Sequence, residues 1–349
     1  MKGCVALTGM GYGMERPIRV VQYGIGAIGS ALTRLLTAKG WVRLVGAVDI
    51  DREKVGRDLG MVAGLGNRLG IPVSSSLEEA LSEAEADVVV HSTVSRLGLV
   101  WPQIRGAVER GLDVVSSCEE LAYPWKRHPD LAREIDECAR SHNSTLLGAG
   151  VNPGFVMDMM VLALTAACQE VEKIEVYRVV DASTRRLPLQ RKIGAGMTVD
   201  EFQAKVAEGS IGHVGLEESM ALVADSLGWS LDEEATSIEP IVAEKRTSSS
   251  FLTVEPGRVA GLRQTARGTM GGREVLSLKL EMYLGAERPL DEIRIKAVPS
   301  LDVTFHGGVA GDAATVAILV NVLPRVLTAR PGLLTMRDIP LPFALGGNL

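Results

Sequence analysis

The sequence predicts an α/β protein: an N-terminal doubly wound parallel sheet, then a second α+β domain built on a mostly antiparallel sheet. Three observations support this fold class. From residue 17 to about 150, short apolar segments alternate with helix-like segments, the pattern of strands joined by crossover helices. A glycine-rich turn follows the first of these apolar segments. After Gly150 the chain changes to longer segments of β character, and its 349 residues suit two domains.

The first domain is expected to hold five strands, with helices between them. The strands are predicted at 19–23, 42–48, 87–91, 113–117 and 145–147, and the helices at 30–36, 76–83, 101–110 and 129–141. Ligands of such sheets bind beyond the carboxyl ends of the strands. Two of these ends carry polar side chains and are where chemistry is expected: His91-Ser92-Thr93, and Ser116 through Glu120.

The turn after the first strand has the spacing Gly24-x-Gly26-x-x-Gly29, and the second strand ends at Asp49. In a Rossmann domain the first glycine permits the tight turn and the second lets the backbone approach a pyrophosphate. The third lets the helix pack close to the strand, and the helix N-terminus faces the phosphate charge. Asp49 follows Gly24 by about 25 residues, near the spacing at which a carboxylate binds the adenosine ribose. The alternative is a glycine-rich turn in some other α/β protein, which the preceding strand, the following helix, the second strand and the acid together make less favoured.

These features predict NAD or NADP as the cofactor. Asp49 would bond a free 2′-hydroxyl and repel a 2′-phosphate, which favours NAD, whereas Arg52 could neutralise a phosphate, so NADP is expected to be tolerated. Asn152 begins a turn that either lines the nicotinamide pocket or is structural. The candidate cofactor-binding residues are Gly24, Gly26, Ala27, Ile28, Gly29, Asp49, Arg52, Ser92, Thr93, Cys118 and Asn152.

The second domain is expected at 151–310. Val151-Asn152-Pro153-Gly154 predicts a turn, followed by an apolar helix over 155–167. Strands are predicted at 172–181, 236–254, 262–270, 274–284, 292–298 and 301–305, and helices at 199–207 and 216–227. One face of this sheet is a candidate dimer contact.

The two ends of the chain are expected to differ from the domains between them. Asp312 is predicted to cap a helix from Ala313 to about Leu323, within a segment 311–349 that returns to the Rossmann domain at 17–150. The tail 331–349, rich in proline and glycine, is expected to lie along the surface. Residues 1–16 are glycine-rich, lack the apolar core of a signal peptide, and are expected to be a disordered leader.

Composition argues against several classes of protein. The net charge of −6 argues against a nucleic-acid partner, because phosphate binding needs a basic face. The longest apolar run, 159–168, is too short to span a membrane. The four cysteines show no Cys-x-x-Cys pair or metal-ligand spacing, which indicates reduced thiols in a cytoplasmic protein and no metal site.

Glu119 and Glu120 are the candidate catalytic residues, because they leave a buried strand at its ligand-facing end. A carboxylate partly removed from water has a raised pKa and can exchange protons near neutral pH. The alternative is that the acidic pair starts the next helix, where negative charge suits the helix dipole.

Several segments resemble the 2,4-diaminopentanoate dehydrogenases and the related native amine dehydrogenases. They are Ser116-Ser117-Cys118-Glu119-Glu120-Leu121-Ala122-Tyr123-Pro124-Trp125, the runs 150–158, 178–183 and 185–194, Gly311-Asp312-x-Ala314-Thr315, and Pro331 to Met336. The resemblance covers residues 17 to about 340. Dihydrodipicolinate reductases are wider relatives, but their His-His and Lys-x-Asp-Ala-Pro-Ser-Gly-Thr segments are missing from this sequence.

The resemblance implies NAD(P)-dependent oxidative deamination of a primary amine, the reverse reductive amination of a ketone with ammonia, and a homodimer. In the family a glutamate at this strand end is the acid/base; Glu120 is favoured here by analogy with other Rossmann oxidoreductases, and Glu119 is the second choice. Such a carboxylate would deprotonate the ammonium, orient water and stabilise the cationic iminium.

The family's preferred substrate has an α-amino acid end, which needs a cation for its carboxylate and acceptors for its ammonium. Asp181, Arg185 and Gln190 are the candidate substrate-binding residues, with Arg186 and Lys192 beside them. Alternatively, these charges form an exposed hairpin or a subunit contact. Two other functions remain open: an imine reductase of the dihydrodipicolinate reductase type, which needs no ammonia, and a non-catalytic NAD(P) sensor, in which both glutamates are dispensable.

Overall fold

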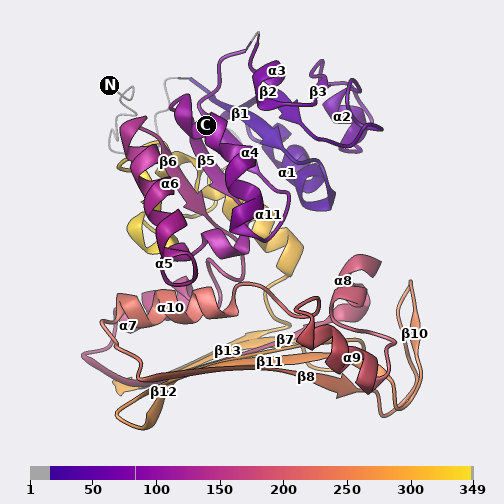
Figure 1. The fold of residues 1–349 in the computed structure, drawn as a ribbon, viewed down its shortest axis with the longest axis vertical. Helices are drawn as coiled ribbons and strands as arrows, with labels where there is room; N and C mark the ends of the chain where they lie inside the picture. Colours follow the sequence, from indigo (N-terminus) through magenta and orange to yellow (C-terminus); the bar gives the residue numbers. More distant parts are fainter. Residues whose placement is uncertain (1–15, 83, 347–349) are drawn as a thin grey trace. The chain divides into compact units, whose positions relative to one another are not determined.

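The structure, a computed structural model, describes residues 16–82 and 84–346 (Figure 1). The expected leader therefore lies outside the described residues except for Arg16, whose guanidinium pairs with Asp87 at 2.7 Å. The chain forms two compact units, the first from Met1–Phe155 and Gly311–Leu349 and the second from Val156–Ala310. The second unit is thus inserted within the sequence of the first.

The first unit is built on a seven-stranded sheet in the order β15-β6-β5-β4-β1-β2-β3, and every strand pair is parallel. Strand β1 lies between β2 and β4, so the strand order reverses beside β1, where ligands of doubly wound sheets bind. The strands are β1 (Ile18–Tyr23), β2 (Val42–Val48), β3 (Val73–Ser74), β4 (Val88–His91), β5 (Asp113–Ser116), β6 (Thr145–Gly148) and β15 (Gly332–Leu334).

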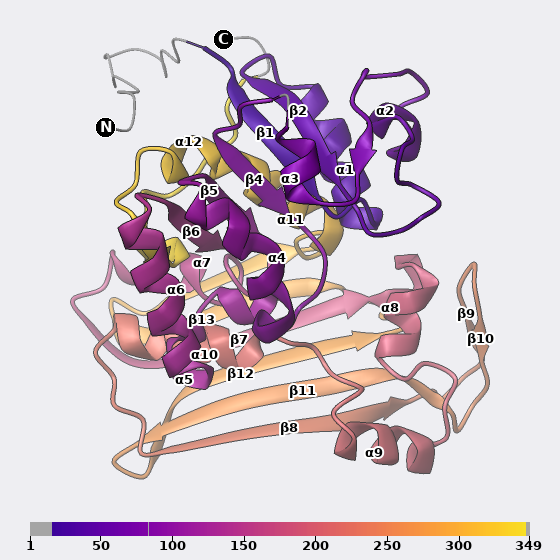
Figure 2. The ribbon, with the colours of Figure 1, turned by 45° about the horizontal axis from the view of Figure 1, so that its top comes forward.

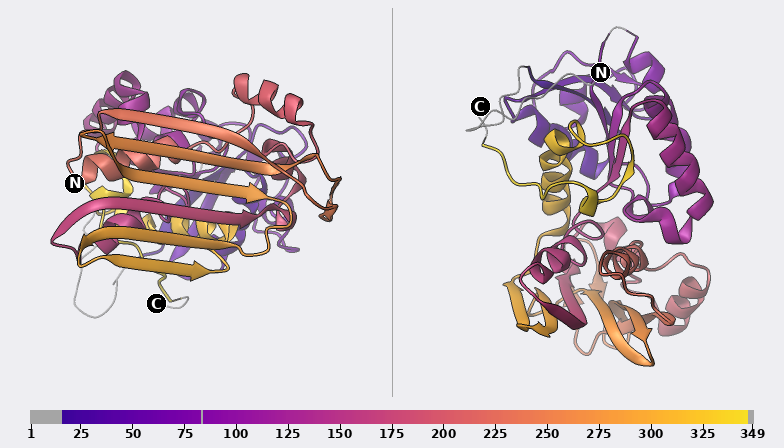
Figure 3. Two further views of the ribbon diagram at one scale, coloured as in Figure 1. Left: turned by 90° about the horizontal axis from the view of Figure 1, so that it is seen from below. Right: turned by 90° about the vertical axis from the view of Figure 1, so that its left-hand side faces the viewer.

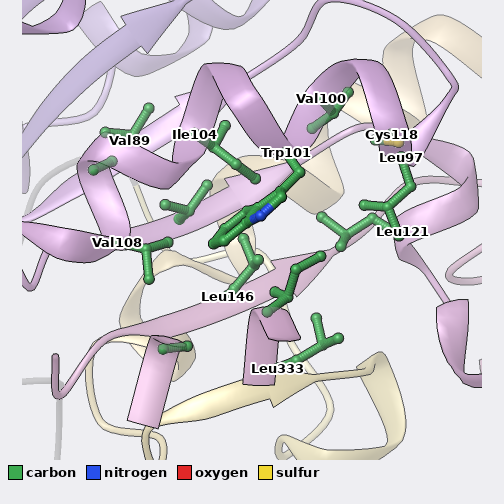
Figure 4. Packing of buried hydrophobic residues seen from close by; sticks show 14 of the residues in the cluster. Val89, Leu97, Val100, Trp101, Ile104, Val108, Cys118, Leu121, Leu146 and Leu333 are labelled. Atoms are coloured by element: carbon green, nitrogen blue, oxygen red, sulfur yellow. The ribbon is translucent and has the colours of Figure 1, made fainter. Parts of the chain in front are cut away.

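Helices cover both faces of this sheet (Figure 3, right). On one face pack α4 (Leu97–Glu109) and α6 (Pro129–Ser141), whose apolar side chains belong to one core cluster. Figure 4 shows Trp101 of α4 in this cluster, together with Ile104 and Leu146. The other face carries α1 (Ala27–Thr37), α11 (Gly311–Asn321) and α12 (Leu323–Val326). Shorter helices are α2 (Leu59–Val62), α3 (Leu77–Ala80), α5 (Pro124–Arg127) and the 3₁₀ turns η1 (Glu119–Leu121) and η3 (Met336–Asp338).

The second unit is built on a six-stranded sheet in the order β14-β13-β7-β12-β11-β8. Only β7 and β12 pair in parallel, so the mostly antiparallel sheet is confirmed. The strands are β7 (Glu170–Asp181), β8 (Glu233–Val242), β11 (Val259–Met270), β12 (Arg273–Tyr283), β13 (Leu290–Val298) and β14 (Leu301–His306); β9 (Thr247–Ser248) and β10 (Thr253–Val254) form a separate pair.

The two faces of this second sheet differ. On one face lie α7 (Met159–Thr165) and α10 (Leu216–Ser226), over buried side chains such as Ile174 and Leu278 (Figure 2). The other face is turned to the viewer in Figure 3, left. Since successive side chains of a strand point to opposite faces, Lys279, which lies between the buried Leu278 and Leu280, belongs to this other face. The remaining elements are η2 (Ala182–Thr184), α8 (Leu187–Lys192) and α9 (Val199–Ala207).

Four expectations about individual elements are wrong. Asp312 is not a cap, because α11 already begins at Gly311 and Asp312 lies in its first turn. The helix expected from 155 starts only at Met159, whose N–H is accepted by Asp158. The single strand expected over 236–254 is instead one long strand, β8, followed by the two-residue strands β9 and β10. The tail does not lie wholly along the surface: Gly332–Leu334 is buried as the edge strand β15 beside β6.

Candidate functional site

The glycine turn after β1 is fixed by steric contacts. Gly24 has φ +83°, a conformation that favours glycine, and a Cβ there would lie 2.5 Å from the Ser92 carbonyl oxygen. A Cβ on Gly29 would lie 1.8 Å from the Gly24 carbonyl oxygen, so the helix can approach the strand only without one. Gly24 and Gly29 therefore have the packing roles that the motif predicts.

Gly26 differs from its two neighbours in the motif. A Cβ at this position would meet no atom within 4 Å, so space is open beside it. Gly26 is also the N-cap residue of α1, which continues through Ala27 and Ile28, and no side chain caps this end. The first N–H groups of a helix lack intrahelical partners and attract anions. This end of α1 therefore has the space and the donors to hold a pyrophosphate.

Asp49 lies at the carboxyl end of β2, next to this turn, and is 8% exposed. Its carboxylate accepts the N–H of Ile25 at 2.7 Å and that of Asp51 at 2.9 Å, and it pairs with Lys54 at 3.1 Å. Burial alone would raise the pKa of Asp49, but these hydrogen bonds and the ammonium of Lys54 outweigh it, and the pKa is lowered. Asp49 is thus an anion that fixes the glycine turn. Arg52 lies exposed on the loop that follows.

Ser92 and Thr93 have structural partners at the end of β4. The Ser92 hydroxyl donates to the Gly24 carbonyl at 3.1 Å and accepts from Gln22 at 3.1 Å. Ser92 therefore helps to hold the glycine turn in place. Thr93 lies exposed, and its hydroxyl donates to Gln103 at 2.9 Å.

His91 is a buried residue that sequence reasoning placed at the strand end but gave no role. Its Nε2 bonds Gln103 at 3.0 Å, its Nδ1 bonds the hydroxyl of Ser116 at 2.9 Å, and that hydroxyl accepts the Cys118 N–H at 3.1 Å. Burial lowers the pKa of His91 to about 4. The ring is therefore neutral at pH 7, and the side chain links the end of β4 to the turn that follows β5.

Cys118 belongs to the apolar core of the first unit and is 1% exposed. Its thiol donates to the Ser95 carbonyl at 3.3 Å, and burial raises its pKa to about 12. The side chain is therefore a core thiol rather than a ligand for cofactor. Any contact to cofactor at this position would have to come from its backbone.

The two glutamates that follow have different environments. Glu120 is 2% exposed, and its Oε2 accepts the N–H of Leu97, the first residue of α4, at 2.7 Å. Its Oε1 accepts from Arg96 at 2.7 Å and lies 3.5 Å from the guanidinium of Arg127. Its Oε2 lies 3.2 Å from Nε2 of His128. Burial favours a higher pKa, but the hydrogen bond and positive charge of Arg96 and the Leu97 N–H outweigh it, and the pKa of Glu120 is lowered. Glu120 therefore serves as the N-terminal cap of α4.

Glu119 is half-buried and begins the 3₁₀ turn η1 directly after β5. It stands at the carboxyl edge of the parallel sheet, the edge at which the turn after β1 and the end of β4 also lie. As a whole residue, Glu119 is more exposed than Glu120, which is 2% exposed.

The turn at 149–155 leads out of β6, and its backbone is held by α11: the Val151 N–H donates to Thr315 Oγ1 at 3.2 Å. Asn152 is 9% exposed, and its Oδ1 is buried without a hydrogen-bond partner among the described residues. A buried amide oxygen without a partner is costly. A bound donor such as a carboxamide would remove that cost, so Asn152 fits a cofactor-binding role.

In the second unit, Gln190 is fully buried and holds the segment 182–185 in place. Its amide nitrogen donates to the carbonyls of Ala182 at 3.0 Å and Arg185 at 2.8 Å, and its oxygen accepts from Ser249 at 2.8 Å. With both ends of the amide used by the protein, Gln190 shapes this segment rather than contacting substrate.

Asp181 and Arg185 are half-buried on the same segment. Asp181 Oδ1 accepts from the N–H of Ser183 at 2.9 Å and of Gly285 at 3.2 Å. The segment 187–192 forms helix α8 rather than the hairpin that was the alternative. In the sheet of this unit, the buried Arg178 of β7 pairs with Asp291 of β13 at 2.7 Å. Sequence reasoning missed this ion pair, because it depends on the pairing of two strands that lie far apart in the chain.

The described part of the chain holds no group of three or more His, Cys, Asp or Glu side chains that could hold a metal ion. Among the same residues, no helix is long and apolar enough to cross a membrane.

Comparison with known proteins extends these observations. The model of the 2,4-diaminopentanoate dehydrogenase C-terminal domain matches residues 155–349, and that of the dihydrodipicolinate reductase N-terminus matches residues 18–117. A 2,4-diaminopentanoate dehydrogenase from Acetoanaerobium sticklandii is 34% identical, over 96% of each chain.

Solved structures agree with this assignment. An amine dehydrogenase from Mycobacterium smegmatis superimposes with a TM-score of 0.83 and 28% identity, over 94% of this chain and 97% of that one. The WlbA dehydrogenase from Bordetella pertussis, solved with NADH and UDP-GlcNAcA, shares only the fold, at 16% identity and a TM-score of 0.51 over 83% and 75% of the two chains. The chain belongs to the 2,4-diaminopentanoate dehydrogenase family and is an NAD(P)-dependent oxidoreductase of the amine dehydrogenase type.

Proposed function

We propose that this chain oxidises a primary amine of the 2,4-diaminopentanoate type, or a simpler one, to a ketone and ammonia, with Glu119 as the acid/base. The single observation that carries the assignment of Glu119 is the difference between the two strand-end glutamates. Glu120 is buried, caps the N-terminus of α4 and pairs with two arginines. Glu119 is half-buried at the ligand-facing edge of the sheet.

The environment of Glu120 makes it a poor base. Its carboxylate oxygens are occupied by Leu97, Arg96 and His128, and its lowered pKa means that it holds a proton only weakly. A base that acts near neutral pH needs a higher pKa and access to the reacting group. The role that the resemblance gives to a glutamate at this position therefore falls to Glu119.

The reaction balances as amine, NAD(P)⁺ and water giving ketone, ammonium and NAD(P)H. When bound, the nicotinamide supplies the acceptor for the hydride that leaves the amine carbon. Glu119 would take a proton from the substrate ammonium, which gives the free amine of this equation, and pass that proton to solvent. It would then hold the water that attacks the iminium carbon, accept the proton that this water loses, and return it to the departing nitrogen. Its negative charge also stabilises the cationic iminium.

The residues of the first unit fit a nicotinamide dinucleotide. The open space at Gly26 and the uncapped end of α1 suit the pyrophosphate, and Asp49 lies where a ribose would be bound. Asn152 Oδ1 would accept a hydrogen bond from the nicotinamide carboxamide. In the second unit, we propose Arg185 for the substrate carboxylate and Asp181 for its ammonium, with Gln190 shaping the segment that carries them.

We further propose that the protein is cytoplasmic and forms a homodimer through the outer face of the second sheet. Cys118, Cys138 and Cys168 are free thiols, which suits a reducing compartment. On the sheet face, Glu281 is 6% exposed and bonds Tyr177 and Arg263 at 2.7 Å each. The mixed charges of this face complement a second copy, and light scattering of the purified protein tests the dimer.

The experiment for the activity is consumption of NADH or NADPH with 2-amino-4-oxopentanoate and with simple ketones, with and without ammonium. Ammonia-dependent turnover is the expected result. Glu119→Gln should then lower kcat by about 10² to 10⁴ while leaving the affinity for NADH unchanged. Turnover without ammonium would indicate an imine or carbonyl reductase, and tight cofactor binding without turnover would indicate a sensor. Full activity of Glu119→Gln would remove Glu119 from the mechanism.

A further inference from the structure

The loop after β2 places a lysine where the sequence drew attention only to Asp49 and Arg52. Lys54 lies 3.1 Å from Asp49 Oδ2 and 3.3 Å from Asp51 Oδ2, and its side chain is 26% exposed. The Lys54 N–H donates to the Asp51 carbonyl at 2.9 Å, which closes a turn and brings the side chain back toward the end of β2. One ammonium is thus shared by two carboxylates.

This arrangement lies at the expected position of the adenosine ribose. Asp49 ends β2, beside the glycine turn, and its Oδ2 also accepts the Ile25 N–H from that turn. The next residue, Ile50, leaves 84% of its surface exposed, an apolar surface of a kind that suits an adenine ring. A ligand whose ribose reaches Asp49 would therefore bring its 2′-substituent close to the ammonium of Lys54.

We propose that Lys54 is the residue that lets this site accept a 2′-phosphate as well as a free 2′-hydroxyl. With a 2′-hydroxyl present, Lys54 stays paired with Asp49, and the carboxylate keeps acceptor capacity for the hydroxyl. With a 2′-phosphate present, the flexible lysine stem lets the ammonium turn from the carboxylates to the phosphate. Without Lys54, the dianion would meet the charges of Asp49 and Asp51 uncompensated.

Arg52 is the competing candidate, because it too is a cation on this loop. Arg52 is exposed, and no hydrogen bond or ion pair joins it to Asp49 within the described residues. An exposed cation is screened by water and salt and contributes little. Lys54 is half-buried and already in contact with the ribose-binding acid, so its charge acts at shorter range and in a less polar environment.

The inference rests on the proposed cofactor site, and the test separates the two by using fragments that lack nicotinamide. Calorimetry would measure the Kd of the full-length protein for ADP and for adenosine 2′,5′-diphosphate. We expect Lys54→Gln to raise the Kd for the 2′,5′-diphosphate about tenfold or more and that for ADP less than about threefold. Lys54→Arg should largely restore binding of the 2′,5′-diphosphate, and Arg52→Gln is the matched comparison, with a change below about threefold.

Each other outcome contradicts the inference. If Lys54→Gln weakens both fragments equally, Lys54 only supports the fold of the loop. If Arg52→Gln has the larger effect on the 2′,5′-diphosphate, Arg52 is the selecting residue. If the wild type binds ADP but not the 2′,5′-diphosphate, the inference about Lys54 is wrong and the proposed cofactor site still stands. If it binds neither fragment, both the inference and the proposed cofactor site are wrong.

Discussion

Replacing Glu120 by alanine should destabilise the first unit from the N-terminus of α4. The buried N–H of Leu97 would lose its only carboxylate acceptor, which costs about 1–3 kcal/mol. The pairs with Arg96 and Arg127 add little, about 0–1 kcal/mol each, because those side chains are 50% and 34% exposed and would be re-solvated. The free energy of unfolding should therefore fall by about 1–5 kcal/mol, most of it from the Leu97 N–H.

Hydrogen exchange of the α4 amides, together with urea unfolding followed by far-UV circular dichroism, measures this effect. Glu119→Ala is the matched control, because Glu119 is adjacent in sequence but only half-buried; its unfolding free energy should change by less than about 1 kcal/mol. Faster exchange over 97–109 in the Glu120 variant alone is expected. Equal effects of the two substitutions would refute the assignment of Glu120 as the cap of α4.

The lowered pKa of Glu120 gives this effect a defined pH dependence. A carboxyl whose pKa is lower in the folded state stabilises that state above its unfolded pKa, and the stabilisation is lost as the pH falls through the folded pKa. The difference between wild type and Glu120→Ala should therefore be full at pH 7 and shrink below about pH 4.3, the ordinary glutamate value. A difference that stays constant into strong acid would contradict the ionised state of Glu120.

Two further predictions concern the cofactor turn and the buried histidine. Gly29→Ala should destabilise the protein and abolish ADP binding, because the Cβ would lie 1.8 Å from the Gly24 carbonyl oxygen. Gly26→Ala should weaken ADP binding with little change in melting temperature, because its Cβ meets no protein atom within 4 Å. Melting curves and calorimetry check both variants, and equal destabilisation would count against the open space at Gly26. For His91, whose pKa is lowered to about 4, the folded state should lose stability as the pH falls from about 6.5 toward 4, and an imidazole NMR titration near 6.5 instead would refute its burial as a neutral ring.

Periodicity was sufficient to predict the elements whose apolar pattern is uninterrupted. The strand at 42–48 and the helix at 129–141 are confirmed at their predicted bounds. The strand is a mostly apolar run that ends in three buried residues, and the helix repeats buried side chains at Ala132, Ile135 and Ala139. The fold class followed from such elements, together with the tight turn that the motif predicts at Gly24, where φ is +83°. Local sequence was enough in these cases because the forces that define the elements are local.

The residues that could not be predicted depend on contacts between distant parts of the chain. Strand β15 has only three residues, and two contacts with distant residues hold it. The Gly332 N–H donates to the carbonyl of Ser144, just before β6, and the Leu333 N–H donates to the carboxylate of Asp136 in α6. The difference between Glu119 and Glu120 depends on where Arg96 and Leu97 lie, which no spacing in the sequence reports. Lys54 was missed because a lysine five residues after an acid carries no motif, and only the turn at Asp51 brings it back.

Strand β15 also has a consequence for the order in which the protein is made. The sheet of the first unit gains its last strand from residues 332–334, and helix α11 comes from 311–321, both after the whole of the inserted second unit. During synthesis, Val156–Ala310 can therefore fold as a unit while β6 still has an unpaired edge. An exposed strand edge is prone to wrong pairing. Residues 332–334 close that edge only after the second unit has been made, so nascent chains that stall before residue 332 should aggregate more readily than chains that have passed it.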